Sequence, residues 1–291
     1  MQTNFSSPAV VCRPALPGDK ADVLEFTKFI WDGHDYIKYV WDDWLSDPQG
    51  LLAVAEYGGR AVALGKASYV APGQWWLEGL RVDPQFQGLK IASHIFEYLE
   101  DWRSEHAGGA FRLMTSSDRV QVHHLCERLG WLKVGDVKSY RAAPTPGTGE
   151  AFQPVAQNDV TRALSFASAN LAYSGGLINS SWKFAAPDEF TLLEKIRQNQ
   201  LSWWRGRAGL LAWWDDEDDG ETILGVGFIA CPMESLEAML VDIRRLAGGL
   251  GFSSVLWQAP VRADVESALK AAGFLSRWDG SAFLFEKKQE P

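Results

Sequence analysis

The stretch that decides the fold of this chain runs Trp75-Trp76-Leu77-Glu78-Gly79-Leu80-Arg81-Val82-Asp83-Pro84-Gln85-Phe86-Gln87-Gly88-Leu89-Lys90-Ile91-Ala92-Ser93-His94-Ile95-Phe96. Its first part predicts an apolar strand that carries a single carboxylate. A turn rich in Pro and Gly follows, and then a helix begins. Because the first turn of a helix has unpaired backbone N–H groups and roughly half a positive charge from the peptide dipoles, we expect an anion such as a pyrophosphate to bind there.

This stretch resembles the diphosphate-binding signature of the GNAT superfamily of acyl-CoA N-acyltransferases, in which a strand ending Val-x-Pro leads to Gln/Arg-x-x-Gly-x-Gly/Ala. The residues that fit the signature are Val82, Pro84, Gln87, Gly88, Ile91 and Ala92. One position departs from it, because Lys90 stands where the family normally has glycine. Its side chain either crowds the phosphates or pairs with them through its ammonium group.

The resemblance implies acetyl-CoA as a co-substrate and no metal. The residues it assigns to the phosphates are Gln87, Gly88, Leu89, Lys90, Ile91, Ala92 and Ser93. Gly79 permits the strand bulge that, in this family, separates two strands and admits the pantetheine arm. The backbone groups expected to pair with that arm belong to Leu80, Arg81 and Val82, and one N–H faces the thioester oxygen.

Two residues are candidates for the proton transfers of acetylation. Glu78 lies four residues before Val82, where some members of the family carry a catalytic glutamate, so it is the candidate general base. The alternative is a buried carboxylate that holds a neighbouring arginine or backbone N–H. Cys126 stands four residues before Gly130-Trp131, where the family often has a general-acid tyrosine, although a small core residue on a helical stripe is an equally good interpretation.

The acceptor is expected to bind at the loop between the first two helices, as it usually does in this superfamily. The candidate residues in that loop are Asp32, His34, Asp35 and Tyr36. Two carboxylates beside aromatic rings suit a cationic amine. Solvated capping residues over an aromatic core would give the same pattern, so both interpretations stay open.

Hydrophobic periodicity predicts alternating strands and helices, an α/β (α+β) protein, in both halves of the chain. The second half resembles a second GNAT-type fold, so the resemblance implies two GNAT-type domains, each a mixed, mostly antiparallel sheet flanked by helices. Residues 144–149 have the small, Pro-rich composition of a linker. Residues 1–143 are therefore the predicted acetyltransferase domain. Residues 151–291 repeat the order of elements, but residues 231–235 lack the phosphate signature, so this second domain is predicted to be degenerate and to bind no CoA.

Composition limits the classes of function. The chain has 291 residues, 46% of them hydrophobic, and a formal net charge of -9. This charge disfavours nonspecific attraction to nucleic acid, and no apolar run reaches the roughly 20 residues of a bilayer span. Three widely separated cysteines suit a reducing compartment, so we expect a cytoplasmic protein without a membrane or nucleic-acid partner. No spacing of His, Cys, Asp and Glu suggests a metal site.

These observations predict an N-acetyltransferase that moves an acetyl group from acetyl-CoA to a primary amine by direct attack in a ternary complex. The run from Glu78 to Val82 also looks like that of vertebrate histidine N-acetyltransferases, which favours an amino acid or small amine as acceptor. The alternatives are an acyl-CoA sensor or scaffold that has lost catalysis, and an enzyme that acetylates a protein side chain. Both a monomer and a homodimer fit the sequence.

Overall fold

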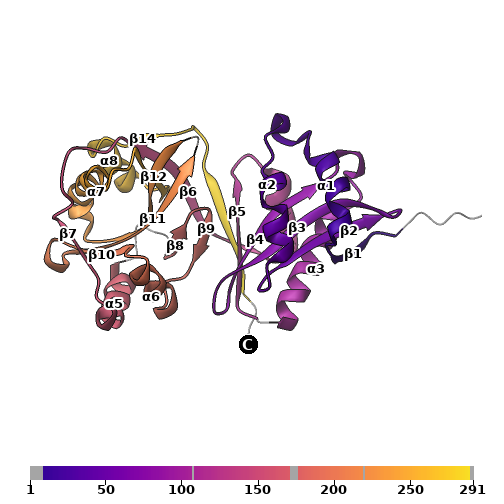
Figure 1. Ribbon diagram of the computed structural model, residues 1–291, viewed down its shortest axis with the longest axis horizontal. Helices are drawn as coiled ribbons and strands as arrows, with labels where there is room; N and C mark the ends of the chain where they lie inside the picture. The colour runs from indigo at the N-terminus through magenta and orange to yellow at the C-terminus, as the bar shows by residue number, and fades with distance from the viewer. Residues whose placement is uncertain (1–8, 107, 171–175, 219, 289–291) are drawn as a thin grey trace, which may run out of the picture. The chain divides into compact units, whose positions relative to one another are not determined.

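The computed structural model describes residues 9–106, 108–170, 176–218 and 220–288. These residues form two compact units that interleave along the chain (Figure 1). Unit 1 comprises Met1–Arg112, Glu127–Gly130 and Lys287–Pro291, and unit 2 comprises Leu113–Cys126 and Trp131–Glu286. The division at residues 144–149 stays a prediction, and this segment forms neither helix nor strand.

Unit 1 is built on an antiparallel sheet in the order β1-β2-β3-β4, with β5 parallel to β4. Its elements are β1 (Val11–Pro14), η1 (Pro17–Asp19), α1 (Lys20–Thr27), η2 (Ile30–Gly33), α2 (Ile37–Ser46), β2 (Leu51–Tyr57), β3 (Arg60–Ala71), β4 (Gln74–Val82), η3 (Pro84–Phe86), α3 (Ile91–His106) and the start of β5 (Ala110–Ser116).

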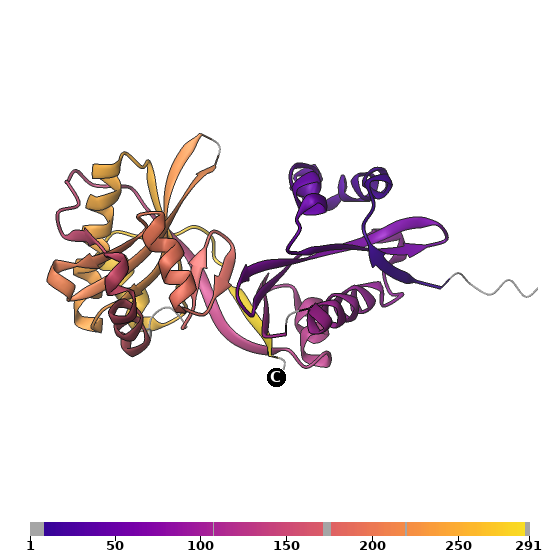
Figure 2. The same ribbon diagram turned by 60° about the horizontal axis from the view of Figure 1, so that its bottom comes forward.

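Helices cover both faces of this sheet (Figure 2). Leu64 packs in a core cluster with α1 and α2, including Trp41. The next residue, Gly65, faces α3, where a Cβ atom would lie 2.7 Å from Ile95. Because successive residues of a strand point to opposite faces, β3 alone supplies both layers of the core.

The end of the chain also contributes to unit 1. Lys287 forms an ion pair with Glu100 on α3 and donates a second hydrogen bond to the carbonyl oxygen of Leu129, at 2.8 Å. Unit 1 therefore takes an ammonium group from the last residues of the sequence.

Unit 2 contains the larger part of the chain, with strands in the order β7-β10-β11-β12-β13-β6-β15. Its elements are α4 (Val120–Arg128), β6 (Leu132–Ala142), β7 (Phe152–Pro154), η4 (Gln157–Asp159), α5 (Val160–Asn170), β8 (Ile178–Ser180), β9 (Lys183–Ala185), α6 (Glu189–Arg197), β10 (Leu201–Trp204), η6 (Arg205–Arg207), β11 (Gly209–Asp218), β12 (Glu221–Ala230), η7 (Met233–Ser235), α7 (Leu236–Leu250), β13 (Ser254–Pro260), α8 (Ala263–Ala271), β14 (Leu275–Ser276) and β15 (Ala282–Lys288). The last two residues of α4 belong to unit 1.

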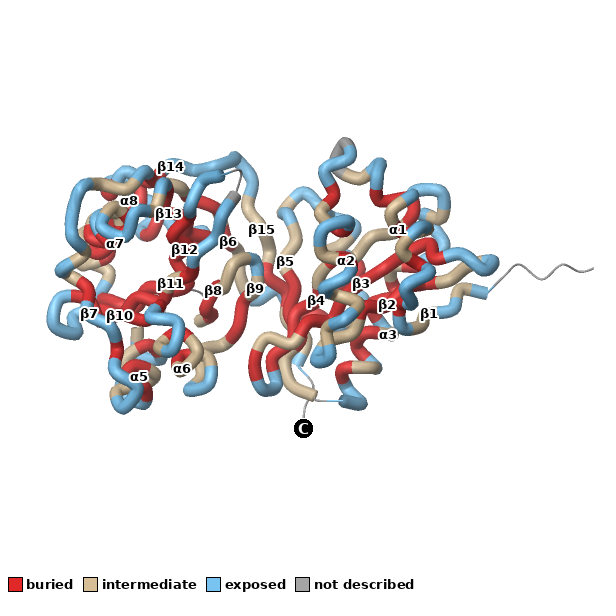
Figure 3. Tube along the Cα trace, in the orientation of Figure 1, coloured by how far each residue is buried: buried red, intermediate tan, exposed pale blue. Residues whose placement is uncertain are grey.

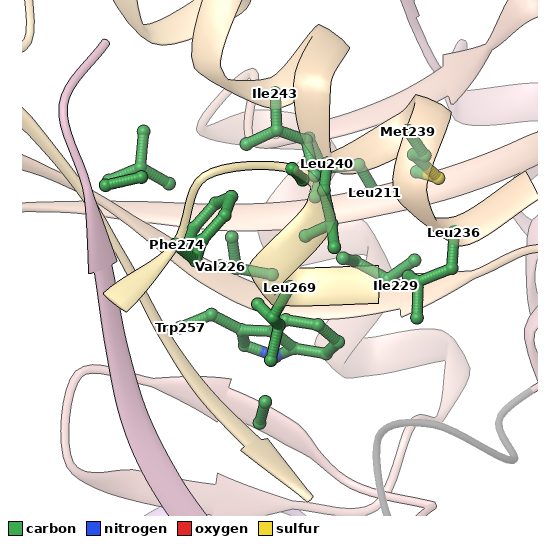
Figure 4. Packing of buried hydrophobic residues seen from close by; sticks show 14 of the residues in the cluster. Leu211, Val226, Ile229, Leu236, Met239, Leu240, Ile243, Trp257, Leu269 and Phe274 are labelled. Carbon is green, nitrogen blue, oxygen red and sulfur yellow. The ribbon is translucent and has the colours of Figure 1, made fainter. Parts of the chain in front are cut away.

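The main core of unit 2 lies between its sheet and helices α7 and α8. Figure 4 shows Trp257 of β13 packed near Leu269 of α8, with Leu240 and Ile243 of α7 above them. A second cluster, which includes Phe228 of β12, packs with residues of α5 and α6. Figure 3 shows that the central strands of each unit are mostly buried, as expected of sheets covered by helices.

The predicted fold class is confirmed, since each unit is a mixed, mostly antiparallel sheet with flanking helices. One prediction from the sequence is wrong. The acidic residues 215–220, which end in Gly220, predict a solvated hairpin turn. In the structure β11 continues through Asp218, which pairs with Glu221 of β12. Cross-strand pairing overrides the turn propensity of this segment, and the side chains of Asp215, Asp216 and Glu217 are exposed. Within the described part of the chain, no helix has the length and apolar composition of a membrane span.

Candidate active site

A β-bulge in β4 opens the candidate site. Lys66 pairs with Glu78 and Leu64 pairs with Arg81, so two residues of β4 oppose Gly65 alone. One of the two is Gly79, with φ of 69°, which a residue with a side chain adopts only at a cost. The predicted bulge is confirmed, and it interrupts the ladder next to the candidate base.

The turn after β4 leads to the N-terminus of α3, the part of a helix where anions bind. Asp83 accepts a hydrogen bond from the backbone N–H of Gln85 at 2.9 Å, and α3 begins at Ile91. The predicted phosphate residues Gln87, Gly88, Leu89 and Lys90 are exposed, Ala92 is half-buried, and Ile91 and Ser93 are buried. A Cβ atom on Gly88 would meet no heavy atom within 4 Å, so the space over this turn is open.

Lys90 keeps the backbone conformation that glycine would supply. Its φ of 59° lies in the left-handed region, which costs a residue with a side chain about 1 kcal/mol or more. The carbonyl oxygen of Lys90 accepts a hydrogen bond from the N–H of Ser93 at 2.9 Å, so this residue starts the helix. The lysine therefore adds a positive charge to the turn in a backbone conformation that glycine favours.

A second cation contacts the same helical turn. Arg128, at the end of α4, donates a hydrogen bond from its guanidinium group to the hydroxyl oxygen of Ser93. Arg128 and Ser93 are 35 residues apart in the chain. Two positive side chains are thus attached to the N-terminal turn of α3.

Glu78 is half-buried and held by its neighbour on β3. The hydroxyl group of Ser68 donates a hydrogen bond to Glu78 Oε1 at 2.5 Å. Lys66, directly opposite Glu78 in the strand register, is fully buried and forms an ion pair with Asp47. The carboxylate of Glu78 therefore lies among polar side chains on one face of the sheet, partly shielded from bulk water.

The predicted acceptor loop forms a buried ion pair with β4. Arg81 Nε lies 2.7 Å from Asp35 Oδ2, and their side chains are 11% and 3% exposed. The guanidinium carbon of Arg81 lies 5.3 Å from the ring centroid of Tyr36, close enough for a cation–π contact. Asp35 therefore has its charge matched within unit 1. His34 is exposed, and the side chain of Asp32 lies outside the described residues.

Tyr36 has an altered acidity. Burial raises the pKa of its hydroxyl group above the ordinary value, and the nearby carboxylates of Glu78 and Asp35 add to the rise, while Arg81 opposes it. Tyr36 is thus a protonated phenol at neutral pH. The structure brings together Tyr36, Asp35, Arg81 and Glu78, which the sequence placed on separate segments.

Cys126 lies in unit 2 and is completely buried. Its carbonyl oxygen accepts a hydrogen bond from the N–H of Trp131 at 2.8 Å, which closes the end of α4. Full burial is what the small-core interpretation requires, and the general-acid role stays a prediction. Within the part of the chain that the structure describes, no group of three His, Cys, Asp or Glu residues could hold a metal ion.

Sequence reasoning missed three residues of the site, which are Lys66, Ser68 and Arg128. Lys66 and Ser68 alternate along β3 in phase with Leu64, so strand periodicity could have placed them on the same face as Glu78. Nothing in the sequence signals the contact of Arg128 with α3, because it joins two helices far apart in the chain.

Comparison with known proteins finds a family resemblance in the N-terminal part of the chain. The model of the acetyltransferase (GNAT) family matches residues 20–131. This match covers less than half of the chain, and it shows that residues 20–131 are similar to a GNAT acetyltransferase domain. Probable N-acetyltransferase 16 of Homo sapiens is 27% identical over 106 residues, which are 36% of this chain and only 29% of that relative.

Two solved structures share the fold over nearly the whole chain. A GCN5-related N-acetyltransferase from Sphaerobacter thermophilus is 16% identical, with a TM-score of 0.62, and 98% of each chain is covered. A tandem GNAT protein from the clavulanic acid biosynthesis pathway is 9% identical, with a TM-score of 0.55, covering 97% of this chain and 99% of that chain. At these identities the likenesses show the fold alone, which is shared over nearly the whole chain.

Proposed function

We propose that this protein is an acetyl-CoA-dependent N-acetyltransferase that acts on a primary amine of a small molecule or amino acid. The observation that carries the proposal is the open turn from Val82 to Ile91 directly after a bulged strand that bears Glu78. The turn offers backbone N–H groups to the pyrophosphate of CoA. The register between β4 and β5 covers only Gln74 to Trp76. Leu80 to Val82 lie beyond it, where their backbone groups would pair with the pantetheine arm.

In the proposed reaction, Glu78 removes a proton from the acceptor ammonium, directly or through water. The neutral amine attacks the thioester carbon, and an N–H group of β4 stabilises the developing oxyanion. Collapse of the resulting tetrahedral intermediate breaks the C–S bond and releases the CoA thiolate. The nitrogen loses its extra proton to give the amide, and the thiolate takes up a proton from water. The hydrogen bond from Ser68 supports this role because it fixes one carboxylate oxygen of Glu78.

Lys90 and Arg128 support binding of the cofactor rather than loss of it. We propose that both cations pair with phosphate oxygens, since both are attached to the first turn of α3. The lysine would then strengthen the phosphate seat, and the exposed position of its side chain argues against crowding.

The buried pair of Asp35 and Arg81 refines the prediction for the acceptor loop. Because Arg81 already neutralises Asp35, we propose that this pair shapes the pocket and that Glu78 supplies the negative charge facing the amine. Tyr36, which is protonated at neutral pH, can donate a hydrogen bond to the acceptor.

Release of free thiol from acetyl-CoA in the presence of a panel of amines and amino acids tests this function. The Glu78→Gln variant is expected to lose at least roughly 100-fold in turnover, the typical contribution of a general base, while its affinity for CoA stays the same. Glu97→Gln, which changes an exposed carboxylate on α3, is the matched control and should keep full activity. Binding of CoA without turnover of any amine would favour the sensor. Acetylation of proteins alone would favour the protein acetyltransferase.

A further inference from the structure

A small apolar cluster on unit 2 is separate from the main core. Trp214, Ile223 and Leu256 pack together on neighbouring strands and are all buried. The adjacent residues Leu224 and Val255 belong to the main core. Because successive side chains of a strand alternate between faces, the cluster lies on the opposite face of the sheet.

Trp214 forms a fixed platform on this face. It pairs across the strands with Gly225, where a Cβ atom would lie only 2.0 Å from Cε2 of the indole. The ring therefore lies flat over the glycine backbone. Its Nε1 atom is buried and has no hydrogen-bond partner among the described residues, so the indole is not held there by a polar contact.

Two further tryptophans border the hollow next to this platform. Trp182 is 46% exposed at the turn between β8 and β9, and Trp278 is 40% exposed after β14. Ser181, which precedes Trp182, has a φ of 55°, so the turn adopts a strained conformation beside this exposed indole. The hollow has a volume of about 450 Å³, the size range of small-ligand pockets.

The charges around the hollow are mainly negative. Asp216 and Glu217 line it on β11, against the single guanidinium group of Arg277. A neighbouring hollow that also touches Trp214 contains Lys195, which already supplies an internal cation. The hollow with the tryptophans is therefore the one with charge complementarity to a positive ligand.

We propose that the hollow formed by Trp182, Trp214 and Trp278, with the carboxylates of Asp216 and Glu217, binds a small organic cation that carries an ammonium group. The faces of indole rings attract such cations, and carboxylates at the rim complete the site. This site lies within unit 2 and is independent of acetyl transfer in unit 1. It gives the degenerate second domain a binding role of its own.

Calorimetric titration of the full chain with choline tests this site. The control ligand is the uncharged carbon analogue of choline, in which a tert-butyl group replaces the trimethylammonium group. We expect choline to bind roughly five- to thirtyfold more tightly than this analogue, the range set by one cation–π contact. Added salt should weaken the binding of choline because part of the attraction is to the rim carboxylates.

Two variants test whether choline binds in this hollow. Trp278→Leu and Asp216→Asn should each weaken choline at least about fivefold, and both positions are exposed, so the fold is kept. Glu237→Gln, an exposed carboxylate on α7, is the matched control and should not change the affinity. Equal affinity for choline and its neutral analogue would overturn the proposal, as would no binding of either ligand. An equal loss in Glu237→Gln and Asp216→Asn would also refute it.

Discussion

Replacement of Gly79 by alanine tests whether the bulge in β4 depends on close approach to α2. A Cβ atom at this position would lie 2.4 Å from Cζ3 and 2.6 Å from Cη2 of Trp44, and φ is 69°. The left-handed conformation costs about 1 to 2 kcal/mol for alanine. Displacement of the packed indole adds about 1 to 3 kcal/mol, as other overpacked cores do. The free energy of unfolding should therefore fall by roughly 2 to 5 kcal/mol.

Urea unfolding followed by circular dichroism measures this loss, and Gly73→Ala separates its two causes. Gly73 has a φ of 65° and lies just before β4, but a Cβ atom there would meet nothing within 4 Å. The Gly73→Ala variant should therefore lose only the conformational contribution, about 1 to 2 kcal/mol of the free energy of unfolding. A second variant, Trp44→Leu in the Gly79→Ala background, should recover part of the loss by making room.

The rate of acetyl transfer should fall in the same order as stability, since the bulge sets the direction of the β4 backbone groups that the proposed function places against the thioester. We expect Gly79→Ala to reduce acetyl transfer more than Gly73→Ala does. If Gly79→Ala and Gly73→Ala lower the free energy of unfolding by the same amount, the indole of Trp44 moves aside without cost and close approach does not explain the glycine at position 79.

Three further predictions concern charged residues. Asp35→Asn should lower the free energy of unfolding, measured in urea, by about 3 to 5 kcal/mol because it removes the carboxylate that neutralises Arg81 in a buried site. Asp42→Asn, in an exposed pair, should cost less than about 1 kcal/mol, and similar losses would contradict this prediction. Burial lowers the pKa of Lys195 from 10.5 to about 8, so the folded state binds fewer protons than the unfolded state between these values. The stability of the native protein relative to Lys195→Met should therefore rise by up to about 3 kcal/mol as the pH increases across this window, and a flat difference would disprove the pKa shift. Lys90→Gly should weaken CoA at least about fivefold by calorimetry, as the loss of an ionic contact requires, without lowering stability; unchanged or tighter binding would show that the lysine only crowds the phosphates.

The sequence predicts the local features of the site well. The strand, the bulge at Gly79 and the helix after the turn all follow from patterns within about twenty residues. Backbone geometry in this stretch is fixed by glycine, proline and strand alternation, which act over short distances. Lys90 shows the limit of this reasoning, because a non-glycine residue adopts the left-handed conformation that the signature normally assigns to glycine.

Contacts between distant segments could not be predicted in the same way. The pairs of Asp35 with Arg81 and Arg128 with Ser93 join residues 46 and 35 positions apart. Side chains of this kind meet only after the sheet and helices have packed, and no periodicity records their partners. Between residues 150 and 209 the strands have only three or four residues, too few to show an alternating pattern.

The ion pair of Lys287 with Glu100 has a consequence for synthesis of the protein. The ribosome synthesises α3 long before it reaches the codon for Lys287, which lies 187 residues after Glu100. A nascent chain therefore cannot form this contact until all of unit 2 has been synthesised. A fragment that stops at residue 149 would lack this ammonium group.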